Sequence, residues 1–202
     1  WKLDKTRQLY QPQNGSLVAY WKLDGNARDL ANSTDGILVN TTFNQSADCK
    51  IDDCVYFDGV SIINVTEDST GSRFDDITGE LTIEAWVKLQ DPAQGGIVLD
   101  ASDSSTASTW RFRAFVGSGG GGDAQLEIFT DGTNFDKQRT VDGILNDSNW
   151  HHVAYTYSPN GNFNIYIDGV DQAIGSIGSD GTVTTINTGA SAVTIGARQP
   201  YS

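Results

Sequence analysis

Apolar and polar side chains alternate along much of the chain with a period of two. In the clearest run every second residue from Leu81 to Leu89 is apolar, and most of the residues between them are polar. Such alternation predicts a β-strand with one face turned toward a core. Because no window carries a sustained apolar pattern at helical spacing, the sequence predicts an all-β protein.

Shorter alternating runs, bounded by Gly, Asn, Asp and Ser, predict further strands. They are residues 16–23, 36–39, 54–58, 61–65, 96–101, 109–116, 124–130, 150–158, 163–167 and 192–196. The strands on either side of residues 117–122, and of residues 159–161, are expected to form hairpins. Asp168 and Gly169 predict a two-residue turn, since both positions need positive φ.

The first hairpin carries charge on one face. Arg111 and Arg113 lie on the face of their strand opposite to that of Trp110 and Phe112, and Glu127 lies on the partner strand. We expect a solvated ion pair between the strands, a contact that contributes little to stability.

The aromatic residues divide into core candidates and surface candidates. Alternation places Trp21, Trp110 and Trp150 among apolar neighbours, which favours the core. Sugar binding requires an exposed aromatic platform with a few directed polar groups. The candidate platforms are Trp86, Trp110, Phe135 and Tyr201.

Charge and hydropathy limit the partners. The net charge of -13 makes nucleic acid and anionic membrane surfaces poor partners and leaves cations as plausible ones. No run approaches the roughly 18 apolar residues of a membrane span, so no membrane insertion is expected. Residues 1–10 are too polar for a signal peptide, which suggests a mature or trimmed chain.

Two features predict an extracellular or cell-surface protein. Cys49 and Cys54 are the only cysteines, and their spacing suits a small disulfide loop, the alternative being two free thiols. Six Asn-x-Ser/Thr sequons exceed the roughly two that chance predicts from the composition, which favours a glycoprotein. The acceptor residues are Asn14, Asn32, Asn40, Asn44, Asn64 and Asn146.

Several short sequence motifs, taken in their order along the chain, resemble those of the laminin-G-like jelly rolls in the concanavalin-A-like lectin and glucanase superfamily. They are residues 17–26, 35–38, 56–59, 81–88, 149–155, 165–169 and 193–196. The resemblance implies an all-β, two-sheet antiparallel jelly-roll sandwich over residues 16–202, preceded by an extension of residues 1–15. It also implies extracellular recognition of a glycan or a surface protein, but it identifies no ligand.

One departure from the family suggests self-association. Family members normally continue after the strand at residues 193–196 with a closing strand, and no such phrase is present. The phrase at residues 1–4 is repeated at residues 21–24. We therefore expect Trp1, Leu3 and Leu9 to belong to a donor strand that completes the sheet of a neighbouring subunit. The alternative is a tail on its own domain or a remnant of a larger protein.

Catalysis is not expected. Glu80 and Glu84 resemble the catalytic strand of the superfamily's retaining glucanases, but the middle carboxylate is replaced by Thr82. Residues four apart in a plain strand are separated by about 13 Å, whereas a retaining pair needs about 5 Å. His151 and His152 are adjacent on a predicted strand, so they point to opposite faces and are expected to be structural.

Calcium is the expected cofactor. Asp29, Asn32 and Asp35 offer oxygen ligands on one loop, which suits a hard cation, and the resemblance implies calcium at this place. Asp24 and Asp58 are additional candidate ligands. The alternative is a solvated acidic turn.

Three functions from different classes therefore remain, of which an active glycosidase fits only the spacing of Glu80 and Glu84. The sequence favours a non-catalytic structural or adhesive subunit of a cell-surface filament, assembled by strand complementation. The alternative is a carbohydrate- or protein-binding module of a larger surface protein.

Overall fold

The computed structural model describes residues 16–44, 48–65, 74, 76–91, 95–102, 110–117, 121–129, 134–159, 162–179, 183, 185–186 and 192–196. Within these ranges the chain forms strands and no helix. The strands are β1 (Gly36–Val39), β2 (Thr42–Asn44), β3 (Cys54–Tyr56), β4 (Ile62–Val65), β5 (Leu81–Val87), β6 (Gly96–Ser102), β7 (Trp110–Val116), β8 (Ala124–Phe129), β9 (Phe135–Thr140), β10 (His151–Ser158), β11 (Asn162–Ile167), β12 (Val170–Asp171), β13 (Ile174–Ser179) and β14 (Ala192–Gly196). The described part of the chain holds no helix of the length and hydrophobicity needed to cross a membrane.

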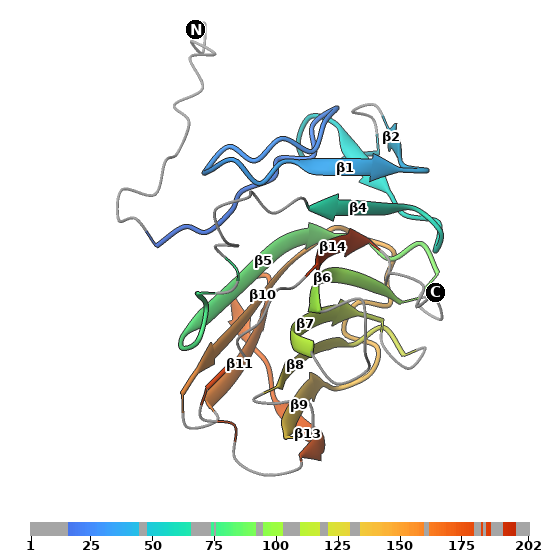
Figure 1. Ribbon diagram of the computed structural model, residues 1–202. Coiled ribbons are helices and arrows are strands. Elements are labelled where there is room, and N and C mark those ends of the chain that lie inside the picture. The colour runs from blue at the N-terminus through green and yellow to red at the C-terminus, as the bar shows by residue number, and fades with distance from the viewer. Residues whose placement is uncertain are drawn as a thin grey trace, which may run out of the picture.

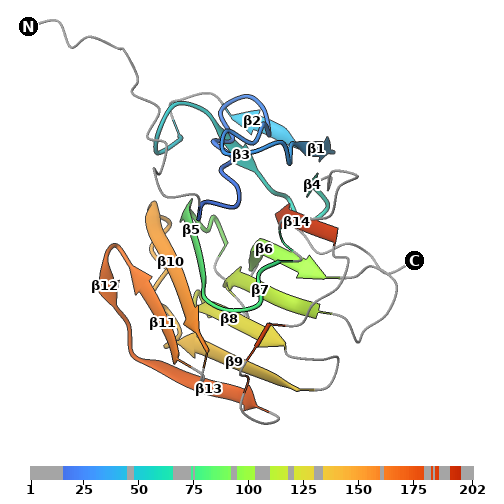
Figure 2. The same cartoon turned by 60° about the vertical axis from the view of Figure 1, so that its left-hand side comes forward.

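The strands form two main antiparallel sheets (Figure 1). The larger sheet has the order β1-β4-β14-β6-β7-β8-β9-β13, and the smaller has the order β12-β11-β10-β5. β2 and β3 form a separate ribbon. Figure 2 shows the two sheets as distinct layers, with β10 and β11 lying beside β8 and β9. The predicted two-sheet antiparallel sandwich is confirmed.

The hydrophobic core lies between the two layers. The larger sheet contributes Phe112 and Leu126, the smaller contributes Val153 and Ile165, and all four are fully buried. Tyr155 crosses the interface, because its hydroxyl donates to a main-chain carbonyl of β7. Burial of this alternating apolar set is the main force that holds the sheets together.

Most of the predicted strands are confirmed to within a few residues, as are both hairpins. The turn after β11 is also confirmed, since Asp168 and Gly169 have φ of 52° and 80°. Two strands of the larger sheet were not predicted. β9 carries polar residues at most positions and β13 is rich in Gly and Ser, so neither shows apolar alternation.

The predicted strand at residues 16–23 is wrong. The described chain has only an isolated bridge here, between Trp21 and Asp29. Side chains replace the ladder of a neighbouring strand: Asp29 accepts from the Tyr20 amide, and the Trp21 indole donates to the Thr34 carbonyl. Trp21 is partly buried against the core and stacks on Phe74 at 6.1 Å, in line with its expected core role.

The predicted solvated ion pair is present but buried. Arg113 Nη1 lies 3.3 Å from Glu127 Oε2, and the two side chains are only 4% and 6% exposed. Asp100 and Lys137 extend the pair, because register aligns these four residues across β6, β7, β8 and β9. Arg113 Nε lies 3.3 Å from Asp100 Oδ1, and Lys137 Nζ lies 3.3 Å from Glu127 Oε1. We call Asp100, Arg113, Glu127 and Lys137 the buried ion row.

Candidate functional site

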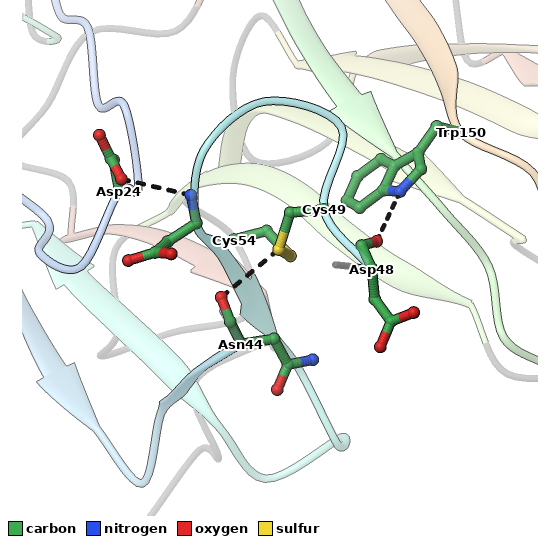
Figure 3. Close-up of a disulfide and its surroundings, with 7 residues drawn as sticks. Asp24, Asn44, Asp48, Cys49, Cys54 and Trp150 are labelled. Atoms are coloured by element: carbon green, nitrogen blue, oxygen red, sulfur yellow. Dashed lines mark hydrogen bonds between the residues drawn. A yellow bond between two sulfur atoms is a disulfide. The ribbon is translucent and has the colours of Figure 1, made fainter. Parts of the chain in front are cut away.

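The disulfide loop lies against the start of β10 (Figure 3). Cys49 and Cys54 are bonded, as predicted, and Cys49 Sγ lies 3.4 Å from the main-chain oxygen of Asn44. The Trp150 indole donates to the Asp48 carbonyl at 2.9 Å. The prediction that Trp150 belongs to the core is therefore wrong. Its ring is half-buried and fastens the loop to the smaller sheet.

The loop places a lysine over an exposed tryptophan. Trp86 lies on the outer face of β5 and is 41% exposed. Lys50 Nζ lies 4.3 Å from the centroid of its ring, at the distance of a cation–π contact. The His152 ring meets the same indole edge-on, with 5.3 Å between centroids. Among the predicted platforms whose side chains the structure describes, Trp86 is the most exposed, and polar groups lie beside it.

Charges of both signs flank the indole. Glu84 is 68% exposed and its Oε2 lies 3.7 Å from His152 Nε2. Lys88 is exposed and follows the last residue of β5. Because side chains alternate along a strand, Glu84, Trp86 and Lys88 belong to one face. We call Lys50, Glu84, Trp86, Lys88 and His152 the Trp86 patch.

Register explains why these residues meet. β5 and β10 pair without interruption, so His152 is opposite Trp86 and Ala154 is opposite Glu84. The neighbours Val153 and Tyr155 point inward and are fully buried, which turns His152 and Ala154 outward.

His151 points away from His152, as predicted, and joins two turns. Its Nδ1 lies 2.8 Å from Asp168 Oδ2, and its Nε2 lies 2.9 Å from Asp147 Oδ1. Burial acts to lower the pKa of His151, but the two carboxylates outweigh it and raise that pKa. Hydrogen bonds, led by Asn149 and then His151, hold the pKa of Asp147 well below its usual range. The His151 bond likewise lowers the pKa of Asp168.

The other platforms predicted from sequence offer less. Phe135 is half-buried, and Lys137 Nζ lies 4.9 Å from its ring centroid. Tyr201 and the side chain of Trp110 lie outside the described residues.

The residues predicted to bind calcium are engaged by their own loop. Asp29 is buried, and its two oxygens accept from the amides of Tyr20, Ala31 and Thr34 and from the Thr34 hydroxyl. Burial acts to raise the pKa of Asp29, but these hydrogen bonds together lower it. Asp35 Oδ1 in turn accepts from the Asp29 amide. Asp29 therefore organises this loop and has its lone pairs directed at donors.

The remaining predicted ligands have similar roles. The Asn32 amide donates to the carbonyls of Leu17 and Val18. Asp24 accepts from Lys22 and from the amide of Asp53, the latter drawn in Figure 3. Asp58 accepts from Ser61 and Val60. Within the described ranges, no three His, Cys, Asp or Glu side chains are grouped to hold one metal ion.

Asp123 differs from these carboxylates. Asp123 is fully buried, and neither of its oxygens has a hydrogen-bond partner among the described residues. Burial raises the pKa of Asp123, against weaker opposing effects of its own amide and of Arg139. Arg139 Nη1 lies 3.9 Å from Asp123 Oδ2 and 3.8 Å from Asp142 Oδ1. The two carboxylates therefore share the Arg139 guanidinium at long distances.

The six sequons differ in exposure. Asn40 and Asn146 are exposed, whereas Asn44 and Asn64 are half-buried. Asn32 uses its amide nitrogen, the atom that would carry a glycan, in the hydrogen bonds described above. Asn14 lies outside the described residues, as do Trp1, Leu3 and Leu9 of the predicted donor strand.

The two glutamates resembling a catalytic pair lie in and just before a regular strand. β5 keeps an unbroken register with β10 from Leu81 to Val87. Glu84 lies within this strand and Glu80 just before it, so no bulge brings them together, and a strand rises about 3.3 Å per residue.

The profile of a protein family matches the chain. The profile described as the concanavalin A-like lectin/glucanases superfamily matches residues 55–202. No curated protein sequence matches.

Solved structures show the same fold. The binding domain of botulinum neurotoxin serotype C1 is 12% identical with a TM-score of 0.57, and the match covers 89% of this chain and 42% of that one. The binding domain of botulinum neurotoxin DC in complex with SialylT is 13% identical with a TM-score of 0.53, covering 91% and 46%. The chain thus spans less than half the length of these neurotoxin chains, and at this identity the likeness shows the fold alone.

Proposed function

The chain belongs to the concanavalin A-like lectin/glucanases superfamily, and from this premise we propose that it is a non-catalytic, extracellular recognition module that binds its ligand at the Trp86 patch. The exposed indole of Trp86 carries the proposal. Large aromatic side chains are mostly buried in folded domains, and an exposed one beside polar groups is typical of a binding surface. The ligand class that such a platform fits best is a saccharide, whose ring faces stack on an indole.

The arrangement is preorganised. Lys50 is presented by a disulfide-closed loop, and His152 and Glu84 stand on paired strands. The main chain at these residues is therefore fixed before a ligand binds, which limits the entropy lost on binding. The disulfide also supports an extracellular location, because such bonds persist in oxidising compartments.

The absence of catalysis is part of the proposal. The carboxyls of Glu80 and Glu84 are not brought together by a bulge, and Glu84 lies beside His152 on an open sheet face. A retaining glycosidase needs two carboxyls about 5 Å apart around the scissile bond.

Saccharide capture tests the proposal. The purified chain is applied to an array of extracellular glycans, together with Trp86→Ala and Tyr20→Ala. Tyr20 is the matched control, because it is an exposed aromatic residue, 44% exposed, outside the Trp86 patch. We expect Trp86→Ala to lose the bound glycans and Tyr20→Ala to keep them. Equal binding by both variants would reject this surface.

An assembly function is supported by one observation. β5 pairs with β10 on one edge, and no described strand pairs with its other edge. An open edge offers backbone groups to an added strand. If residues 1–12 of a neighbour supply that strand, the intact chain forms oligomers and a chain without these residues does not. Light scattering on both distinguishes the cases, since a monomer in both would end the assembly reading.

Calcium is proposed at Asp123 in place of the loop around Asp29. A buried carboxylate without hydrogen bonds is costly, so Asp123→Asn should raise the unfolding temperature without calcium. Calcium should stabilise the wild-type chain and leave Asp123→Asn unchanged. If Asp29→Asn, and not Asp123→Asn, removes the calcium effect, the loop prediction is correct instead.

A further inference from the structure

We infer that the Trp86 patch is specific for an anionic saccharide, a sugar that carries a carboxylate or a sulfate. This inference rests on the proposed function and adds the class of ligand. It is unexpected from the whole chain, because the net charge of -13 repels anions.

The charges of the patch are ordered along β5. Glu84 precedes Trp86 and Lys88 follows it, each two residues away on the same face, and Lys50 reaches the indole from the disulfide loop. Glu84 and Lys88 therefore lie on opposite sides of the indole along the strand, and Lys50 lies over its ring. A sugar ring stacked on Trp86 is oriented by this polarity, with its anionic group toward Lys50 and Lys88.

Glu84 has a polar neighbour within the patch. Its carboxylate lies 3.7 Å from His152 Nε2. The lysines of the patch are held by weaker contacts, since a cation–π contact at an exposed ring is modest. An anionic group can draw Lys50 from the indole into a charge-assisted hydrogen bond, which is stronger, and leave the ring face to the sugar.

The repulsion of the remaining surface does not prevent this. At physiological salt the Debye length is about 8 Å, so distant acidic residues are largely screened while lysines in contact with the ligand are not. The patch can therefore bind an anion locally although the protein as a whole is acidic.

The test uses three saccharides of matched length, measured by titration calorimetry at physiological salt. They are tetragalacturonate, its fully methyl-esterified form and a sulfated galactan tetramer. We expect the uronate or the sulfated sugar to bind at least about tenfold more tightly than the ester. Whichever of these two sugars binds more tightly shows whether the patch prefers a carboxylate or a sulfate. Equal affinity for the uronate, the sulfated sugar and the ester would overturn the inference.

Substitutions separate this inference from the proposed function. Lys50→Gln should weaken the anionic sugar by about three- to tenfold and leave the ester unchanged, whereas Glu84→Gln should strengthen the anionic sugar by about twofold. Arg28→Gln removes the same charge from an exposed residue outside the patch and is the control. If Trp86→Ala abolishes binding but Lys50→Gln changes the affinities for the anionic sugar and the ester equally, the inference of charge specificity is wrong. The proposal that the Trp86 patch is the binding surface is then still supported. If no sugar binds and Trp86→Ala has no effect in any binding assay, both fail.

Discussion

The buried ion row and the Trp86 patch are built from the same kinds of residues, yet they differ in burial. In the row, Arg113 and Glu127 are 4% and 6% exposed, and Lys137 lies near the rings of Phe129 and Phe135. In the patch, a lysine lies over an indole and an acid pairs with a histidine, but the side chains are open to solvent.

Burial decides what each set can do. Charges removed from water must be paired, so the members of the row depend on one another for stability. Exposed pairs gain little from each other because water competes for them. The patch is therefore free to exchange its internal contacts for those of a ligand, and the row is not.

The largest expected effect is on the row. Arg113→Leu leaves the carboxylates of Asp100 and Glu127 buried without their shared cation, and should lower the free energy of unfolding by about 3 to 5 kcal/mol. Urea unfolding measures the loss. The matched control is Arg28→Leu, since Arg28 is exposed and lies outside the row. A loss for Arg113→Leu below about 1 kcal/mol would mean that the row is hydrated, and the contrast with the patch would disappear.

The disulfide comes next. Replacing Cys49 and Cys54 by Ser should cost about 2 kcal/mol, because the bond closes only a short loop. The double variant should also bind its ligand more weakly, since Lys50 is no longer held at Trp86. Chemical unfolding and glycan binding are measured together. A loss of stability with unchanged binding would show that the loop does not position Lys50.

The sequence predicted the sandwich and most of its strands because burial of one face imposes a period of two. It predicted the disulfide from spacing and the exposed Trp86 as one platform among several. Alternation alone places Lys88 on the face of Trp86, so this part of the patch could have been found. Lys50 could not, because it reaches the indole from a loop more than 30 residues away in sequence.

The errors have a common physical cause. Residues 16–23 alternate like a strand, but side chains such as Asp29 bind their main-chain groups in place of a neighbouring strand. The prediction of a solvated Arg113–Glu127 pair is wrong because alternation separates the two faces of a strand but does not show whether other residues cover the second face. Asp123 follows a run of glycines, and nothing in its local sequence signals burial.

The contacts of His151 with Asp147 and Asp168, which we call the His151 clamp, have a smaller and pH-dependent effect on stability. The pKa of His151 is raised by folding, so its stabilisation is fully present below the unfolded value of about 6.5 and is lost as the pH rises through the folded value. Asp147 and Asp168 shift downward, so their share is lost only as the pH falls below about 3.9. The clamp should therefore stabilise most between about pH 4 and pH 6.5.

Urea midpoints of the wild type and His151→Gln test this. We expect the gap between the two to be widest near pH 5.5 and to narrow toward about pH 8.5. His152→Gln is the control, because the His152 imidazole lies on the opposite face of β10, beside Glu84 and Trp86. A gap that does not change with pH would show that the imidazole stabilises through its shape and not its charge.

The smallest expected effect comes from repeating one substitution in both regions. Glu84→Gln removes an exposed charge, 68% accessible, and should change the free energy of unfolding by no more than about 0.5 kcal/mol. Glu127→Gln removes the same charge from the row and leaves Arg113 and Lys137 with one carboxylate fewer, which should cost several times as much. Thermal unfolding of both variants at one pH gives the ratio. Equal losses would mean that burial does not separate the two regions, and that the Trp86 patch is held together by its own charges instead of being available to a ligand.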